Sequence, residues 1–203
     1  MSPLETLGFA LGTSFASGLN LYATVAAAGL FQRLGIVTLP EPLAVLSHPV
    51  VLGVAIALFL VEFIADKVPY VDSAWDAVHT FIRPPAAAVL SYSAFAEGVP
   101  EEWKLAAALL AGGVALTSHG AKASTRAAAN TSPEPLSNWT LSLLEDGFAV
   151  FLAWMAAEHP LLTAIIVVAL VIVAVFVIWK LFGYLRRGIA RLKQGPGTSP
   201  AGP

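Results

Sequence analysis

The chain has 203 residues, of which 57% are hydrophobic and 12% are charged, with a net charge of −2. Soluble domains carry about 25% charged residues, so this composition excludes an ordinary water-soluble globular protein. The absence of cysteine excludes disulfides, iron–sulfur clusters and thiol chemistry. Basic patches interleaved with aromatic residues are also missing, and we therefore expect no nucleic-acid partner.

Six apolar segments are predicted to cross a membrane as helices. An apolar run of about 18 residues is long enough to span the roughly 30 Å hydrocarbon layer. The clearest case is 161–178, where Thr163 is the one polar side chain. The third segment is the shortest, and a re-entrant course is the alternative for it. The six segments lie at about 7–34, 43–65, 85–96, 105–118, 139–157 and 161–182.

These segments predict an all-α, polytopic helical membrane protein with about six transmembrane helices. Residues 1–193 are expected to form a single transmembrane domain. The Gly- and Pro-rich tail, 194–203, is predicted to be disordered, because it has too few apolar residues to bury.

The first segment is interrupted by small and polar residues, including Gly12, Gly18 and Asn20. Glycines permit backbone that is not regular helix, and carbonyls or amides freed there can coordinate an ion. Asn20 is therefore a candidate site residue. The alternative is a helix–helix contact, because Gly, Ser and Asn also pack and hydrogen-bond between membrane helices.

Residues 70–83, between the second and third segments, have the pattern of an amphipathic helix. One face carries Val71, Trp75, Val78 and Ile82, and the other carries Asp72, Asp76, His79 and Arg83. We expect this helix to begin at an Asp72 or Ser73 N-cap and to lie at the cytoplasmic interface of the membrane. An ordinary polar connector is the alternative.

The distribution of basic residues indicates a topology. Six alternating spans with both termini in the cytoplasm place nine of the eleven basic residues on the cytoplasmic side, leaving only Arg33 and Lys104 outside. This asymmetry is the positive-inside bias expected of a multi-pass protein of the inner (plasma) membrane.

A short motif occurs once in each half of the chain. Residues 39–43 read LPEPL and residues 132–136 read SPEPL, each just before an apolar segment. Because each half would hold three spans, the two copies would face opposite ways across the membrane. We predict two inverted repeats, about 5–98 and 103–190, an arrangement typical of secondary transporters. Chance recurrence of Pro-Glu-Pro in a Pro-rich loop is the alternative.

Ionisable residues lie within the predicted spans or at their ends. An ionisable group at the membrane centre costs about 2.5–3.5 kcal/mol, so such groups are expected to pair or to line water. We predict that Glu62 and Glu145 meet Lys122 and Arg126 in a vestibule. The candidate residues for a substrate or ion pathway are Asn20, Glu62, Asp66, His119, Lys122, Arg126, Glu145 and Asp146.

Other interpretations of these residues remain open. Asp66, Lys122 and Arg126 could simply reach the headgroup region, as charged residues at helix ends often do. The histidine spacing is not that of a metal site, and we expect neither a metal nor another cofactor.

Five motifs together resemble a family of small bacterial integral membrane proteins catalogued as a domain of unknown function. The resemblance covers roughly residues 5–190 and implies a membrane location but no activity. The motifs are SGLNLY at 17–22, EFIADKVP at 62–69, the Asp, Trp, His and Arg pattern at 72–84, SHGAK at 118–122 and the turn at 130–133.

Three functions are compatible with this pattern. The first is a small transporter or channel with a charged site between the repeats, which would act on a small solute, an ion or a lipid. The second is a membrane enzyme that acts on a lipid phosphate, with Glu62 and Asp66 holding a metal and Arg126, at the end of a loop that starts at Gly120, clamping phosphate. The third is an accessory membrane subunit. The expected surroundings are the lipid bilayer and, in some of these cases, further copies of the chain.

Overall fold

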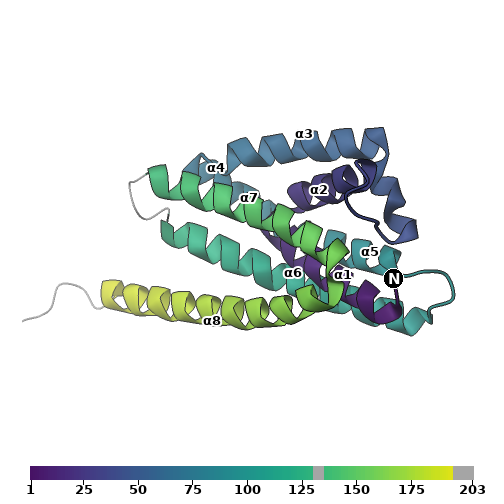
Figure 1. Ribbon diagram of the computed structural model, residues 1–203. Coiled ribbons are helices and arrows are strands. Elements are labelled where there is room, and N and C mark those ends of the chain that lie inside the picture. Colours follow the sequence, from purple (N-terminus) through teal and green to yellow (C-terminus); the bar gives the residue numbers. More distant parts are fainter. Residues whose placement is uncertain (130–134, 194–203) are drawn as a thin grey trace, which may run out of the picture.

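The computed structural model describes residues 1–129 and 135–193, and in these ranges the secondary structure is entirely helical, as predicted (Figure 1). The predicted disordered tail lies outside the described residues. The elements are α1 (Pro3–Leu19), α2 (Leu21–Arg33), the 3-10 helix η1 (Glu41–Ser47), α3 (Pro49–Ala65), α4 (Pro69–His79), α5 (Arg83–Ala94), α6 (Glu101–Ala129), α7 (Pro135–Glu158) and α8 (Pro160–Lys193).

Two segments, Trp139–Glu158 in α7 and Pro160–Gly183 in α8, are long and apolar enough to cross a membrane. A third candidate is the pair η1 and α3, which is bent by 65° at its break. The described residues thus support membrane association with two or three such spans, fewer than the six predicted. The helices α1, α2, α4 and α5 have 17 residues or fewer, which is short for a complete crossing.

The distribution of side chains is inverted relative to a soluble protein. Large apolar residues point outward, with Leu109 and Ile165 exposed by 79% and 70%. Charged residues are buried instead, and Glu62, Arg83 and Lys122 are at most 2% exposed. An apolar exterior around a charged interior suits a chain surrounded by hydrocarbon.

The predicted first span is in fact two helices that fold back on each other. Asn20 separates them with an extended backbone at φ −150° and ψ 105°. Its N–H donates to the Ala16 carbonyl that ends α1, and its side-chain Oδ1 accepts from the Ala23 N–H at 2.8 Å, which caps α2. The predicted interruption of the first segment is thus present at Asn20, between helices of 17 and 13 residues.

The direction of α2 follows from its neighbours. Phe9 and Thr13 of α1 line the same small cavity as Thr24 and Ala28 of α2. Since early residues of α1 face late residues of α2, the two helices are antiparallel and form a hairpin with its tip at Asn20.

The helix α1 is the centre of the bundle and touches α5, α6, α7 and α8. This packing needs glycine at Gly18, where a Cβ atom would overlap Ser118 Oγ and the Ala115 carbonyl of α6. Near the start of α1, a Cβ at Gly8 would overlap the Pro160 carbonyl at the start of α8. Because glycine has no side chain at these two positions, α1 can pack closely against α6 and α8.

The two ends of the described chain lie at opposite ends of the bundle (Figure 1). The start of α1 packs against Pro160, and α8 then runs for 34 residues to Lys193. At 1.5 Å per residue this places Lys193 about 50 Å from the N-terminal end. The location of both termini on the cytoplasmic side of a membrane stays a prediction.

The amphipathic segment is helical, as predicted, but its first residue and the direction of its polar face differ from the prediction. The helix α4 begins at Pro69 with Val68 as N-cap, so an N-cap at Asp72 or Ser73 is wrong. Proline suits this first position because its missing N–H has no partner to find there. The polar face of α4 is buried and its apolar Val71 and Val78 are exposed, so α4 does not lie on the surface with its polar face in water.

The second half of the chain does not repeat the break of the first. The helix α6 is continuous from Glu101 to Ala129, through the segment that would match the interruption at Asn20. A repeat of the broken helix therefore finds no support in α6.

Candidate functional site

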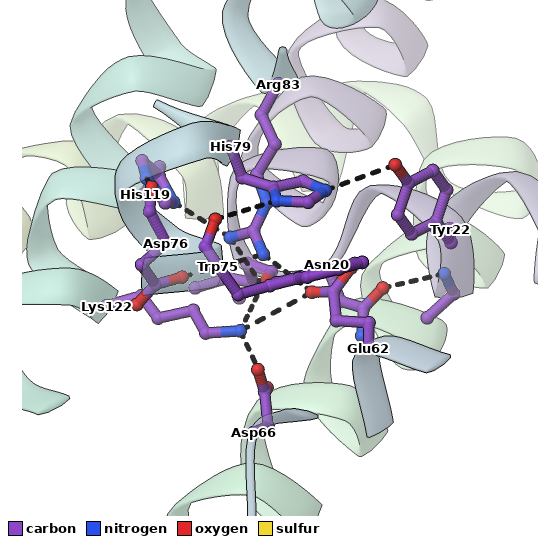
Figure 2. A network of polar contacts seen from close by, with 12 residues as sticks. Asn20, Tyr22, Glu62, Asp66, Trp75, Asp76, His79, Arg83, His119 and Lys122 are labelled. Atoms are coloured by element: carbon purple, nitrogen blue, oxygen red, sulfur yellow. Dashed lines mark hydrogen bonds and ion pairs between the residues drawn. The ribbon is translucent and has the colours of Figure 1, made fainter. Parts of the chain in front are cut away.

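A buried cluster of polar side chains surrounds the tip of the α1–α2 hairpin (Figure 2). It forms where the end of α3, the polar face of α4, the start of α5, the C-terminal part of α6 and the middle of α7 converge. All eight residues predicted from the sequence lie here: Asn20, Glu62, Asp66, His119, Lys122, Arg126, Glu145 and Asp146. We call this the hairpin-tip cluster.

Arg83, the first residue of α5, joins four helices in this cluster. Its Nη1 donates to the carbonyls of Gly18 and Leu19 at 2.8 and 3.0 Å, and its Nη2 donates to Glu62 Oε1 at 2.6 Å. The two carbonyls end α1, where the helix dipole is negative, so a buried guanidinium is well placed to balance them.

Lys122 of α6 places its ammonium group among several oxygens. Its Nζ donates to Asp66 Oδ2 at 2.9 Å and to the Leu19 carbonyl at 3.1 Å. The same Nζ lies 3.6 Å from Glu62 Oε1 and 3.8 Å from Glu145 Oε2. A single buried cation thus lies within ion-pair distance of three carboxylates.

Arg126, one turn further along α6, binds Glu145 through two nitrogens, with Nε and Nη2 at 3.1 and 2.6 Å from Oε2. It also donates to the backbone carbonyl of Asp66 at 3.0 Å and to Asp66 Oδ2 at 3.3 Å. Glu145 is therefore not the sole partner of Arg126. The predicted meeting of Glu62 and Glu145 with Lys122 and Arg126 is present in the structure.

Two histidines border the cluster, and the contacts of His119 fix its protonation. Its Nδ1 lies 2.8 Å from Arg83 Nη1, and since a guanidinium can only donate, this nitrogen must accept. Its Nε2 lies 3.0 Å from the Asp76 carbonyl, which can only accept, so Nε2 carries the hydrogen. His119 is therefore neutral in this arrangement. On the other side, His79 Nε2 pairs with the Tyr22 hydroxyl at 3.1 Å.

The cluster has more acidic groups than permanent cations. The cations are Arg83, Lys122 and Arg126, and Lys67 just after the end of α3 lies close enough to interact electrostatically with Asp66 and Asp146. The six carboxyl groups belong to Glu62, Asp66, Asp72, Asp76, Glu145 and Asp146. With every carboxyl ionised and both histidines neutral, the carboxylates would outnumber the cations by two among the residues that the structure describes. Burying unbalanced charge is costly, so protons or cations must neutralise part of this excess.

Several carboxyl oxygens lack a hydrogen-bond donor. Glu62 Oε2, Asp66 Oδ1, Asp146 Oδ2 and both oxygens of Asp76 are buried and make no hydrogen bond within the described residues. Buried polar atoms are normally hydrogen-bonded, so these oxygens indicate bound protons, water or a cation. No group of three or more metal-ligating side chains has metal-site geometry among residues 1–129 and 135–193.

The comparison with protein families covers this cluster. Residues 7–180 match the family described as "Domain of unknown function (DUF4126)". The chain belongs to this family. The matched range in this DUF4126 member contains the whole hairpin-tip cluster, from Asn20 to Asp146. Neither a curated protein nor a solved structure matches the chain, so its function has to be inferred from the site.

Four residues of the cluster in this DUF4126 protein were not among the predicted site residues. The sequence analysis places Asp72, Asp76, His79 and Arg83 on the polar face of an interfacial helix, yet each is at most 4% exposed. The signal was present in the amphipathic pattern of 70–83. A polar helix face can equally turn toward a polar interior when the exterior is apolar, and that is what α4 does.

Among the described acids of the cluster, Glu145 is the most exposed. The side chain of Glu145 is 13% exposed, whereas those of Glu62, Asp66 and Lys122 are 0% exposed. Glu145 faces a cavity between α1, α6, α7 and α8. It is therefore the acidic group through which the buried cluster meets the outside.

Proposed function

We propose that this DUF4126 protein is a small membrane transporter that carries a cation, with the hairpin-tip cluster as its binding site. The observation that carries the proposal is the charge balance of the cluster, in which six carboxyl groups outnumber the four nearby cations Arg83, Lys122, Arg126 and Lys67 among the described residues. Such a site attracts positive charge and repels anions.

Broken helices at the cluster support a transport role. The end of α1, the start of α2, the end of α3 and the start of α5 all meet there. Many transporters place interrupted helices at their binding site, because the free backbone groups at helix ends supply ligands. Here the freed carbonyls of Gly18 and Leu19 point at Arg83 and Lys122.

The exchange of a proton for a cation follows from the same groups. In the resting state, protons on some carboxyl groups offset the excess negative charge. A cation that binds at Glu62 or Asp146 would replace such a proton, since both residues have a buried oxygen without a hydrogen bond in the described chain. Coupling of proton and cation movement is the expected consequence.

The orientation that we propose differs from the initial prediction. The segment after the apolar part of α8 contains Lys180, Arg186, Arg187, Arg191 and Lys193, which favours a cytoplasmic location of this end in the plasma membrane. The N-terminal end would then lie on the other side. Lys122 and Arg126 do not count toward this bias, because they are paired inside the protein.

The two other functions considered from the sequence are less well supported. The segment that would bind phosphate as a loop, from Gly120 to Arg126, lies within α6, and Arg126 is already paired with Glu145. An accessory role for the segment 70–83 would need its polar face to be accessible, and that face is buried.

Flux across liposomes tests the proposal. Reconstituted protein with a pH-sensitive dye inside the vesicles would be exposed to inward gradients of Na⁺ or K⁺. We expect proton movement with one of them, lost in Asp146→Asn, which keeps an acceptor for Asn20. Glu102→Gln, at an exposed acid at the start of α6, is the matched control and should keep wild-type flux. Equal flux in Asp146→Asn and wild type would remove the cluster from the pathway.

A further inference from the structure

The cavity between α1, α6, α7 and α8 has a volume of about 420 Å³, within the range of small-molecule sites. Its walls are apolar and its floor reaches the hairpin-tip cluster. The walls include Phe15, Phe148, Leu170, Val173 and Val177, and the floor includes Lys122 and Glu145. We call this the α8 groove.

The charged floor sets this groove apart from other spaces on the molecule. Three other cavities between described helices have volumes of about 280, 580 and 610 Å³, and none of them is lined by a charged side chain. These three apolar cavities suit the acyl chains of lipids around an apolar exterior. The α8 groove alone among these four joins an apolar wall to an ionised group.

We propose that the α8 groove binds a hydrophobic cation, a molecule with an apolar body and an ammonium-like or phosphonium-like centre, and that Glu145 pairs with the positive charge. This inference rests on the proposed function and names the substrate class. The groove reaches the exterior through α8, where Val173 is 56% exposed, so the ligand enters from the hydrocarbon layer.

The charge of the ligand follows from what it would meet. The Lys122 side chain is 0% exposed and its ammonium is directed at Asp66 and the Leu19 carbonyl. The Glu145 side chain is 13% exposed and is the charged group accessible from the groove. An anionic lipid or phosphate would therefore meet a carboxylate first, and behind it a cluster with excess acid.

Arg126 keeps other acceptors when Glu145 changes partners. In the absence of a ligand it binds Arg126 Nη2 at 2.6 Å. When Glu145 turns to a ligand, Arg126 still has the Asp66 carbonyl at 3.0 Å, Asp66 Oδ2 at 3.3 Å and Asp72 Oδ1 at 3.7 Å. The guanidinium is thus never left buried without acceptors, which would be strongly unfavourable.

Binding of two probes of equal shape and opposite charge tests the proposal. Purified protein in phosphatidylcholine nanodiscs would be titrated with tetraphenylphosphonium and with tetraphenylborate, and empty nanodiscs correct for partition into lipid. We expect saturable binding of the phosphonium only, weakened roughly tenfold or more in Glu145→Gln through loss of the charge pair. Equal binding of both probes, or preference for the borate, would overturn the proposal.

Two further variants on α8 distinguish the groove from the exposed surface. Val173→Trp places bulk at the groove wall, and Val168→Trp places it at an equally exposed position of the same helix that does not line the groove. The first should abolish binding and the second should not, while both should elute as the wild type on size exclusion. Phosphonium binding without any cation flux in liposomes would overturn the proposed transport and leave the binding site in the α8 groove standing. Cation flux without phosphonium binding would overturn the binding site and leave the proposed transport standing.

Discussion

Asn20 Nδ2 donates to Asp146 Oδ1 at 2.8 Å, and this bond ties the tip of the α1–α2 hairpin to the middle of α7. The same side chain caps α2 through the Ala23 N–H. One residue therefore ends α1, starts α2 and supplies the hydrogen bond to a buried acid. The position of the hairpin and the composition of the cluster depend on each other.

Replacing Asn20 by alanine should destabilise the protein. The change removes a helix cap, worth about 1 kcal/mol, and leaves Asp146 buried without its donor, worth about 1–3 kcal/mol more. Thermal unfolding in detergent measures the effect. Thr117→Ala, which removes an exposed hydroxyl that bonds within α6, is the control and should be close to neutral. An Asn20→Ala variant as stable as the control would contradict the role of the bond.

Replacing Arg83 by lysine should also be damaging, although the charge is kept. Lysine cannot present the guanidinium fork that reaches the Gly18 and Leu19 carbonyls and Glu62 at the same time. Breaking a buried ion pair costs about 3–5 kcal/mol, and we expect Arg83→Lys to lose a large part of that. Chemical denaturation of the variant checks this value.

A double-variant cycle separates the pair from its surroundings. Arg83→Met and Glu62→Leu together should cost less than the sum of the two single changes, because neither charge is then buried alone. Additive losses would show that Arg83 and Glu62 do not interact across the 2.6 Å contact.

Gly18 should not tolerate alanine. A Cβ atom there overlaps the backbone carbonyl of Ala115, which cannot move aside without displacing α6, and overpacking of this kind costs about 1–3 kcal/mol. Gly147→Ala in α7 is the matched control, since a Cβ there meets nothing within 4 Å. The control should be neutral or stabilising by about 0.5–1 kcal/mol, because alanine favours helix more than glycine does. Unfolding temperatures of the two variants that agree within error would count against the close approach of α1 and α6.

The chain without cysteine allows the path of the backbone to be mapped. Single cysteines at Ser2, at the N-terminal end, and in the tail after Lys193 should react with a membrane-impermeant maleimide from opposite sides of intact vesicles. Opposite sides follow from the distance of about 50 Å between the start of α8 and Lys193. Labelling of both cysteines from the same side would restore the alternating path with both termini in the cytoplasm.

The sequence was sufficient to locate most of the candidate site. Acids and bases inside apolar segments must find partners, and this requirement alone brought Glu62, Glu145, Lys122 and Arg126 together. The helix over 70–83 was predicted for a different reason, the helical spacing of its apolar and polar residues. The charge pattern could not say which way α4 turns, because a polar face fits a polar interior as well as it fits water.

The direction of the backbone after Asn20 could not be predicted from the sequence. Small residues indicated an interruption, but a kink, an unwound turn and a reversal have the same composition. The reversal depends on one pair of dihedral angles at Asn20 and on the close packing of Gly8 and Gly18 against α8 and α6. Once α1 and α2 form a hairpin, residues 7–34 no longer make one helix of spanning length.

The charge balance of the hairpin-tip cluster is tested most directly by proton release. Purified protein in an unbuffered detergent solution would be titrated with Na⁺, K⁺ or tetraphenylphosphonium while the pH is recorded. Because the six carboxyl groups of the cluster outnumber the four cations near them, a bound cation should displace protons and acidify the solution. Asp146→Asn should reduce this release, and Glu102→Gln should not. If all three cations leave the pH of the wild-type solution unchanged, the cluster does not exchange protons for cations.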